Sequence, residues 1–178
     1  MYEPGSAGRW RRHASLLAFA APLLVAAGVG GCAREAHLGQ PTTTTSVQTT
    51  GDAASYGVDA LRLRFALPTS FVAVDNRDFA FLARSDEPMA IFSIDREEPG
   101  ITDHDAEAGE SVSDSHLDDV DAKLVTNAVV DGLPPGIAAN ELLVDNGSRS
   151  FSVIMSASPG DLAGMWQTFI ASLHVEPA

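Results

Sequence analysis

Few residues of this chain combine the type and the spacing that covalent chemistry requires, and Cys32 is the first of them. It is the only cysteine among the 178 residues, and it directly follows Val29, Gly30 and Gly31. Small residues before a cleavage point let the backbone enter the cleft of a processing peptidase. The pattern therefore predicts that the chain is cut between Gly31 and Cys32.

The residues before Cys32 have the parts of an export signal. A basic start is formed by Arg9, Arg11 and Arg12, and no charged residue occurs between positions 14 and 31. Positive charge keeps the N-terminus on the cytoplasmic side while the apolar segment enters the bilayer. We therefore expect residues 1–31 to be a signal peptide.

The tetrapeptide of positions 29–32 resembles the bacterial lipobox. This resemblance implies that the sulfur of Cys32 is acylated, as with palmitate, and that the protein is anchored at the extracytoplasmic face of the cell membrane. Two other interpretations stay open. The segment could be an uncleaved anchor, since about 18 apolar residues are the lower limit for a membrane span, although Pro22 and the nearby glycines make it a poor permanent helix. The cysteine could also stand there by chance.

No other nucleophile occurs in a catalytic motif. A serine hydrolase needs a serine on a tight elbow together with a histidine and an acid, and no G-x-S-x-G occurs. Ser148 lies in an expected hairpin turn, where serine is common. None of the histidines past the signal segment is placed as a base: His37, His104, His116 and His174. A glycine-rich phosphate loop is also absent, so we predict no enzyme, no catalytic residue and no cofactor.

Carboxylates with calcium-loop spacing occur in an acidic region at 97–121. This region has ten acids and neither lysine nor arginine. Positions 1, 3, 5 and 12 of a calcium-loop template are filled by Asp103, Asp105, Glu107 and Asp114. The template's glycine at position 6 is replaced by Ala108. A solvated acidic loop is the first interpretation, and divalent-cation binding, calcium above all, is the alternative.

Composition limits the partners and the number of domains. The formal net charge is −13, which argues against binding nucleic acid or docking electrostatically on anionic lipid. About 147 residues remain after cleavage, which suffices for one domain with one core. No second cysteine is available for a disulfide. Arginine outnumbers the single lysine and alanine is abundant, which suggests an actinobacterial type of genome.

A tether and then a folded domain are expected after the signal. Residues 32–55 are rich in threonine and proline without apolar periodicity, which predicts a disordered tether of about twenty residues. Residues 56–178 should form the domain. Leu61, Leu63, Phe65 and Leu67 alternate with polar or small residues, which predicts a strand with one wet face. Short apolar runs at 71–74, 79–83 and 90–94 continue an antiparallel meander, with a turn at 86–88.

The second half of the chain should add helices and a hairpin. Val112, His116, Val120 and Leu124 recur every four residues, which predicts a helix over about 112–125, while the first half of the acidic region should be an exposed loop. Asn146-Gly147 predicts a hairpin with a type I′ turn. Ser158-Pro159-Gly160-Asp161 predicts the start of a final helix, with one apolar face from Leu162 to Leu173. The order predicts an α+β domain whose largely antiparallel sheet is covered by helices.

The strand at 61–67 with Pro68 and Phe71, the joint at 130–133, the hairpin and the last helix resemble PsbP-like domains over about residues 56–176. Actinobacterial lipoproteins of the LpqN type share this α/β/α sandwich behind a signal and a tether. The resemblance implies an adaptor or accessory protein. We therefore expect a non-enzymatic envelope lipoprotein that binds a protein partner or an apolar ligand, with the region 97–121 as its contact surface.

Overall fold

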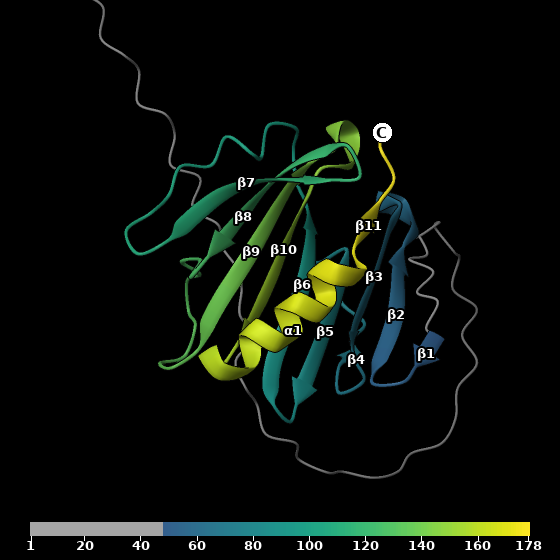
Figure 1. The fold of residues 1–178 in the computed structure, drawn as a ribbon, viewed down its shortest axis with the longest axis vertical. Coiled ribbons are helices and arrows are strands. Elements are labelled where there is room, and N and C mark those ends of the chain that lie inside the picture. Colours follow the sequence, from purple (N-terminus) through teal and green to yellow (C-terminus); the bar gives the residue numbers. More distant parts are fainter. Residues whose placement is uncertain (1–47) are drawn as a thin grey trace, which may run out of the picture.

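The computed structural model describes residues 48–178, which contain eleven strands, two 3-10 turns and one α-helix (Figure 1). The elements follow in the order β1 (Gln48–Thr50), β2 (Ala53–Val58), η1 (Asp59–Leu61), β3 (Leu63–Pro68), β4 (Val72–Ala73), β5 (Phe81–Asp86), β6 (Met89–Arg96), β7 (Ser111–Leu117), β8 (Val120–Thr126), β9 (Ala138–Asp145), η2 (Gly147–Arg149), β10 (Phe151–Ala157), α1 (Pro159–Ser172) and β11 (His174–Val175).

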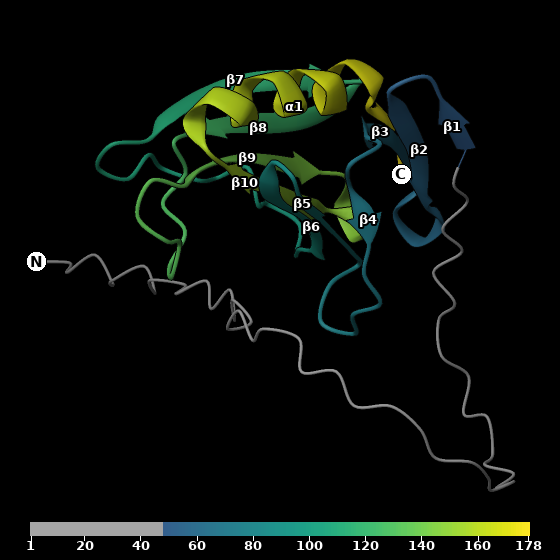
Figure 2. The same cartoon turned by 90° about the horizontal axis from the view of Figure 1, so that it is seen from below.

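Two antiparallel sheets make up the domain. One has the order β1-β2-β3-β11, and the other has the order β4-β5-β6-β10-β9-β8-β7. The helix α1 lies across one face of the larger sheet, beside β3 of the smaller one (Figures 1 and 2). The expected α+β class with a largely antiparallel sheet is confirmed, although a single α-helix covers the sheet in the described part of the chain.

The core between the helix and the two sheets is aromatic. Phe65 of β3 packs on Phe92 of β6 and on Phe169 of α1, with ring centroids 5.2 and 5.8 Å apart. Phe92 and Phe169 are fully buried. The expected alternation in β3 is confirmed for Leu63, Phe65 and Leu67, which are buried, but Leu61 falls in the preceding 3-10 turn.

The final helix begins and packs as its sequence predicts. Ser158 is the N-cap and Pro159 the first helical residue, and the Ser158 hydroxyl accepts a hydrogen bond from the Asp161 N–H. This bond satisfies one of the amides that the first turn leaves free. The buried positions of the helix are Leu162, Met165, Trp166 and Phe169.

The helix expected at 112–125 is wrong: β7 and β8 form a hairpin there. Residues four apart share one face of a helix, but an even spacing also places them on one face of a strand. Asp118 and Asp119 interrupt the run with φ values of 49° and 68°, the left-handed values of a type I′ turn. Two strands therefore replace the helix, while 97–110 is irregular, as expected.

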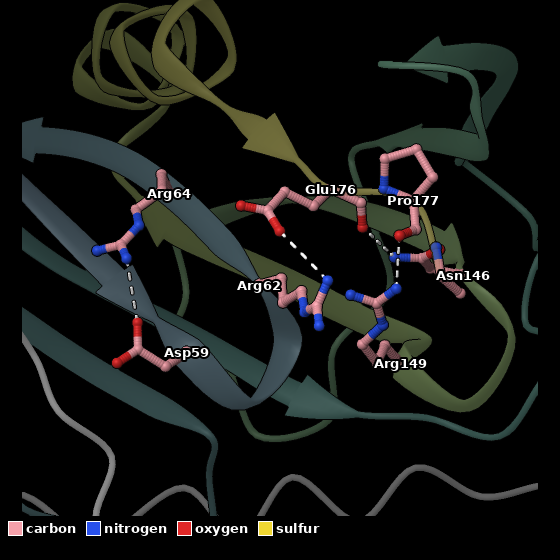
Figure 3. A network of polar contacts seen from close by, with 8 residues as sticks. Asp59, Arg62, Arg64, Asn146, Arg149, Glu176 and Pro177 are labelled. Atoms are coloured by element: carbon pink, nitrogen blue, oxygen red, sulfur yellow. Dashed lines mark hydrogen bonds and ion pairs between the residues drawn. The ribbon is translucent and has the colours of Figure 1, made fainter.

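The hairpin of β9 and β10 is confirmed, but its expected type I′ turn is wrong. Asn146 has a φ of −122°, and only Gly147, at 57°, has the positive φ that such a turn needs at both positions. The connection is longer than a two-residue turn and contains η2. The Asn146 side chain is bonded to the end of the chain. Its Nδ2 donates to the Glu176 carbonyl (Figure 3). Its Oδ1 accepts from the Ala178 N–H.

The folded part begins earlier than residue 56. β1 pairs antiparallel with β2, from Gln48 opposite Ser55 to Thr50 opposite Ala53. β2 in turn pairs antiparallel with β3. Ala54, Tyr56 and Val58 are buried, and the Tyr56 hydroxyl donates to the Phe71 carbonyl at 3.0 Å. The small residues before Tyr56 gave no apolar period, so the sequence placed this strand inside the tether.

Candidate functional site

The acidic region 97–121 is divided by the structure into a loop, the strand β7 and a hairpin turn. The loop extends over 97–110, and Ile101 packs on a small second core formed by Val125, Ala128, Ala139 and Leu143. The Gly100 N–H donates to Asp145 Oδ2 at 2.7 Å. The loop therefore lies across the face of the sheet that is opposite to α1.

Glu110 attaches this loop to the rest of the domain. Its side chain is only 3% exposed. Its carboxylate accepts hydrogen bonds from the N–H groups of Glu107 and Val129, both at 2.8 Å, and from His104 Nε2 at 3.1 Å. Burial raises the pKa of Glu110, but these hydrogen bonds and the nearby His104 outweigh burial and hold the pKa below its ordinary value. Glu110 is therefore a structural acid.

The single lysine of the chain also binds the loop. Lys123 Nζ, on β8, donates to the His104 carbonyl at 3.2 Å. Asp114 is the register partner of Lys123 across the β7–β8 ladder, and its side chain is exposed. The one acid of β7 therefore lies opposite the lysine, whose Nζ is bonded to the loop.

The four residues of the calcium template do not form a cluster. Asp103, Asp105 and Glu107 are exposed along the loop, whereas Asp114 lies on β7. Within residues 48–178, no three His, Cys, Asp or Glu side chains gather as a metal site requires. The structure therefore does not bring the predicted ligands together.

The tip of the β7–β8 hairpin is attached to the smaller sheet. Asp118 Oδ2 accepts from the Val175 N–H at 3.0 Å and lies 2.7 Å from His174 Nδ1. The hydrogen bond from Val175 and the adjacent His174 hold the pKa of Asp118 below its ordinary value, although desolvation opposes them. No local sequence pattern signals this contact, because Asp118 and Val175 are 57 positions apart in the chain.

The strand β7 is the long free edge of the described domain. The other edge strands are β1, β4 and β11, which have three, two and two residues, whereas β7 has seven. β7 pairs with β8 in continuous register from Ser111–Thr126 to Leu117–Val120. The misassigned helix concealed this edge, although the alternation of Ser111, Ser113 and Ser115 is a period-2 signal.

Each histidine of residues 48–178 lies close to a carboxylate. His104 contacts Glu110, His116 lies 3.3 Å from Asp121 and His174 contacts Asp118. Ser148 is exposed in the turn between β9 and β10. A shallow, open depression elsewhere is lined by Ser70, Val72, Arg84, Asp86 and Glu87.

The anchor residues lie outside the described part of the chain. Gly31, Cys32 and His37 precede residue 48, so cleavage and lipidation stay predictions. In residues 48–178 no helix is both long enough and apolar enough to span a bilayer.

Comparison with known proteins places the fold. A scan of protein families finds no match, and a search of curated proteins finds none either. Among solved structures, the chain is similar to the solution structure of cyanobacterial PsbP (CyanoP) from Synechocystis sp. PCC 6803, with a TM-score of 0.53 and 14% identity. The match covers 78% of this chain and 99% of that one. The domain thus has a PsbP-like fold, and at this identity the likeness extends to the fold alone.

Proposed function

We propose that this protein is an exported, non-enzymatic lipoprotein of the LpqN type, held by a lipid on Cys32 at the extracytoplasmic face of the membrane, where it binds a protein partner. We favour a protein partner over an apolar ligand because side chains fill the space between α1 and the sheets. Trp166 and Phe169 of α1 are buried there, with ring centroids 5.3 Å apart, and Phe169 also contacts Phe92 at 5.1 Å. An apolar ligand would have to displace these rings.

We place the contact surface at the acidic region 97–121, whose loop lies on the sheet face opposite to α1. It combines an exposed loop with the free edge β7 and has a strong excess of acids. Charge of one sign on a surface favours encounter with a partner of the other sign. Asp105 and Asp119 are exposed in this region, whereas the exposed Gln167 lies on the helix.

Site-specific photo-crosslinking in the intact cell envelope tests the contact. A photoreactive residue at position 105 or 119 should yield one discrete crosslinked protein, and the same residue at position 167 should not. Equal crosslinking from all three positions would contradict a contact surface at the acidic region. An apolar molecule that co-purifies with the protein and is lost in a Phe169 variant would favour the ligand instead.

Cell fractionation tests the anchor. Cys32→Ala should move the protein from the membrane to the soluble fraction and abolish incorporation of labelled palmitate. Ser15→Ala, in the same leader, is the matched control and should change neither. A Cys32→Ala protein that stays in the membrane would support the uncleaved anchor.

A further inference from the structure

We propose that β7 accepts a basic, extended segment of the partner as an additional antiparallel or parallel strand of the seven-stranded sheet. This inference rests on the proposed function as a protein-binding lipoprotein and assigns it a binding mode. An exposed edge strand presents unpaired N–H and C=O groups, and strand addition is a recurrent way to bind an extended peptide.

The geometry of the hairpin indicates which groups are free. Leu117 and Val120 flank the two-residue turn, so they form a hydrogen-bonded pair, and such pairs alternate along an antiparallel ladder. The β7 residues of the intervening, non-hydrogen-bonded pairs turn their backbone N–H and C=O groups away from β8. These residues are Val112, Asp114 and His116.

The edge has few of the features that prevent strand addition. Natural edges are protected by proline, lysine, bulges or a covering segment. β7 contains no proline or lysine, and its register with β8 has no bulge. Among the described residues, the backbone–backbone hydrogen bonds of the 97–110 loop are made within the loop or to Ser150, and its backbone groups also bond to the side chains of Glu110, Lys123 and Asp145. None of these bonds reaches the outer edge of β7.

Charge selects a basic segment as the occupant. Asp114 projects from the middle of β7, opposite Lys123, whose Nζ is bonded to the His104 carbonyl. Asp118, Asp119 and Asp121 are exposed at and beyond the adjacent turn. Opposite charges across neighbouring strands stabilise pairing, whereas like charges destabilise it. A second copy of this chain, with its own Asp114 and a net charge of −13, is therefore disfavoured. A lysine or arginine at every second position would face Asp114, and small polar residues would fit beside Ser113 and Ser115.

The probe is a fluorescent seven-residue peptide in which lysine alternates with threonine, titrated into the full chain and followed by anisotropy. We expect saturable binding that weakens as salt rises, and slower amide hydrogen exchange at residues 111–117. A peptide with glutamate in place of lysine should not bind.

Two protein variants separate the edge from the charge. Asp114→Pro removes an outward N–H but no bond to β8, so it should preserve the fold and lower the affinity at least about tenfold. Asp114→Asn keeps the edge and should lower the affinity about two- to fivefold, the effect of one cross-strand charge pair.

Two N-methylated peptides keep the test decisive if Asp114→Pro unfolds. One peptide is methylated on the odd-numbered backbone amides and the other on the even-numbered ones. Only one of these two sets of amides faces β7, so only one peptide loses the donors that pair with the edge. One peptide should bind and the other should not. Equal binding of both, exchange protection outside β7, or self-association through β7 would overturn the inference. A partner crosslinked at position 119 whose binding survives Asp114→Pro would leave the proposed function intact and refute only the strand addition.

Discussion

Asp118 Oδ2 and His174 Nδ1 lie 2.7 Å apart, and this contact joins the tip of the β7–β8 hairpin to the last strand. The same carboxylate oxygen accepts from the backbone N–H of Val175. The free edge β7 and the smaller sheet are therefore connected through one side chain at the hairpin turn. Loss of this side chain should loosen β11 first.

Asp118→Ala should therefore speed amide hydrogen exchange at Val175. Part of any destabilisation comes from placing alanine at a positive φ. Asp119→Ala is therefore the matched control, since Asp119 also has a positive φ but makes no described side-chain contact. Asp118→Asn keeps an acceptor for Val175 and should lie between the two. Equal exchange at Val175 in both alanine variants would contradict the attachment.

The acid sensitivity of this contact follows from the lowered pKa of Asp118. A carboxylate with a lowered folded-state pKa stabilises the fold above its ordinary pKa of about 3.9, and this contribution is lost as the pH falls through the lowered value. Exchange at Val175 should therefore increase, relative to the intrinsic rate, only below about pH 4. In Asp118→Asn this increase should be absent.

Glu110 should contribute more to stability than any other acid of the loop. Glu110→Ala removes the acceptor of the Glu107 and Val129 N–H groups, and one such hydrogen bond contributes about 0.5–1.5 kcal/mol to stability. Urea unfolding should show this loss for Glu110→Ala. The neighbouring Glu107→Ala, which removes an exposed side chain, should change stability by less than about 0.5 kcal/mol.

The same acid has a defined pH dependence. The pKa of Glu110 is lowered, so its contribution is present above the ordinary value of about 4.3 and is lost as the pH falls through the lowered value. Glu110→Gln should flatten the decline of unfolding free energy between about pH 5 and pH 2. A decline as steep as in the wild type would show that other carboxylates cause it.

The sequence predicted the elements whose local signals agree with their packing. The helix α1 has a cap, a proline at its first position and one apolar face, and β3 has a clean alternation, so each could be placed without knowledge of the rest. The helix predicted over 112–125 was wrong because a four-residue spacing fits the period of a helix and also that of a strand. Only the ladder with β9 and the turn at Asp118 decide between helix and hairpin.

The candidate site depends on contacts that no local pattern encodes. The role of Glu110 is set by Val129, nineteen residues away, and Asn146 is held by the end of the chain. Both residues occur in segments that the sequence correctly described as loop or turn. Their partners, and therefore their conformations, come from tertiary structure.

Trp166 should tolerate phenylalanine far better than alanine. The ring is almost fully buried against Phe169, so Trp166→Ala should cost about 3–5 kcal/mol of unfolding free energy. Its indole N–H is buried without a described hydrogen-bond partner, and Trp166→Phe removes that unsatisfied donor. The cost of phenylalanine should therefore stay below about 1.5 kcal/mol. The exposed Gln167→Ala is the control, and a costly Trp166→Phe would indicate that the N–H has a partner.

Asn146 should stabilise the end of the chain by its amide rather than by its size. Nδ2 donates to the Glu176 carbonyl at 3.0 Å (Figure 3). Oδ1 accepts from the Ala178 N–H at 2.8 Å. Asn146→Ala removes both bonds and should cost about 1–3 kcal/mol, since a typical hydrogen bond contributes about 1 kcal/mol and the partners lie partly buried.

Asn146→Asp distinguishes the two bonds. It keeps an acceptor for Ala178 but places a carboxylate oxygen against the Glu176 carbonyl, so at pH 7 it should be at least as destabilising as alanine, and protonation of the aspartate should relieve this. Ser148→Ala, at an exposed position in the same connection, should be neutral. Urea unfolding at pH 7 and pH 4 measures all three, and an Asn146→Ala protein as stable as Ser148→Ala would show that the two bonds contribute nothing.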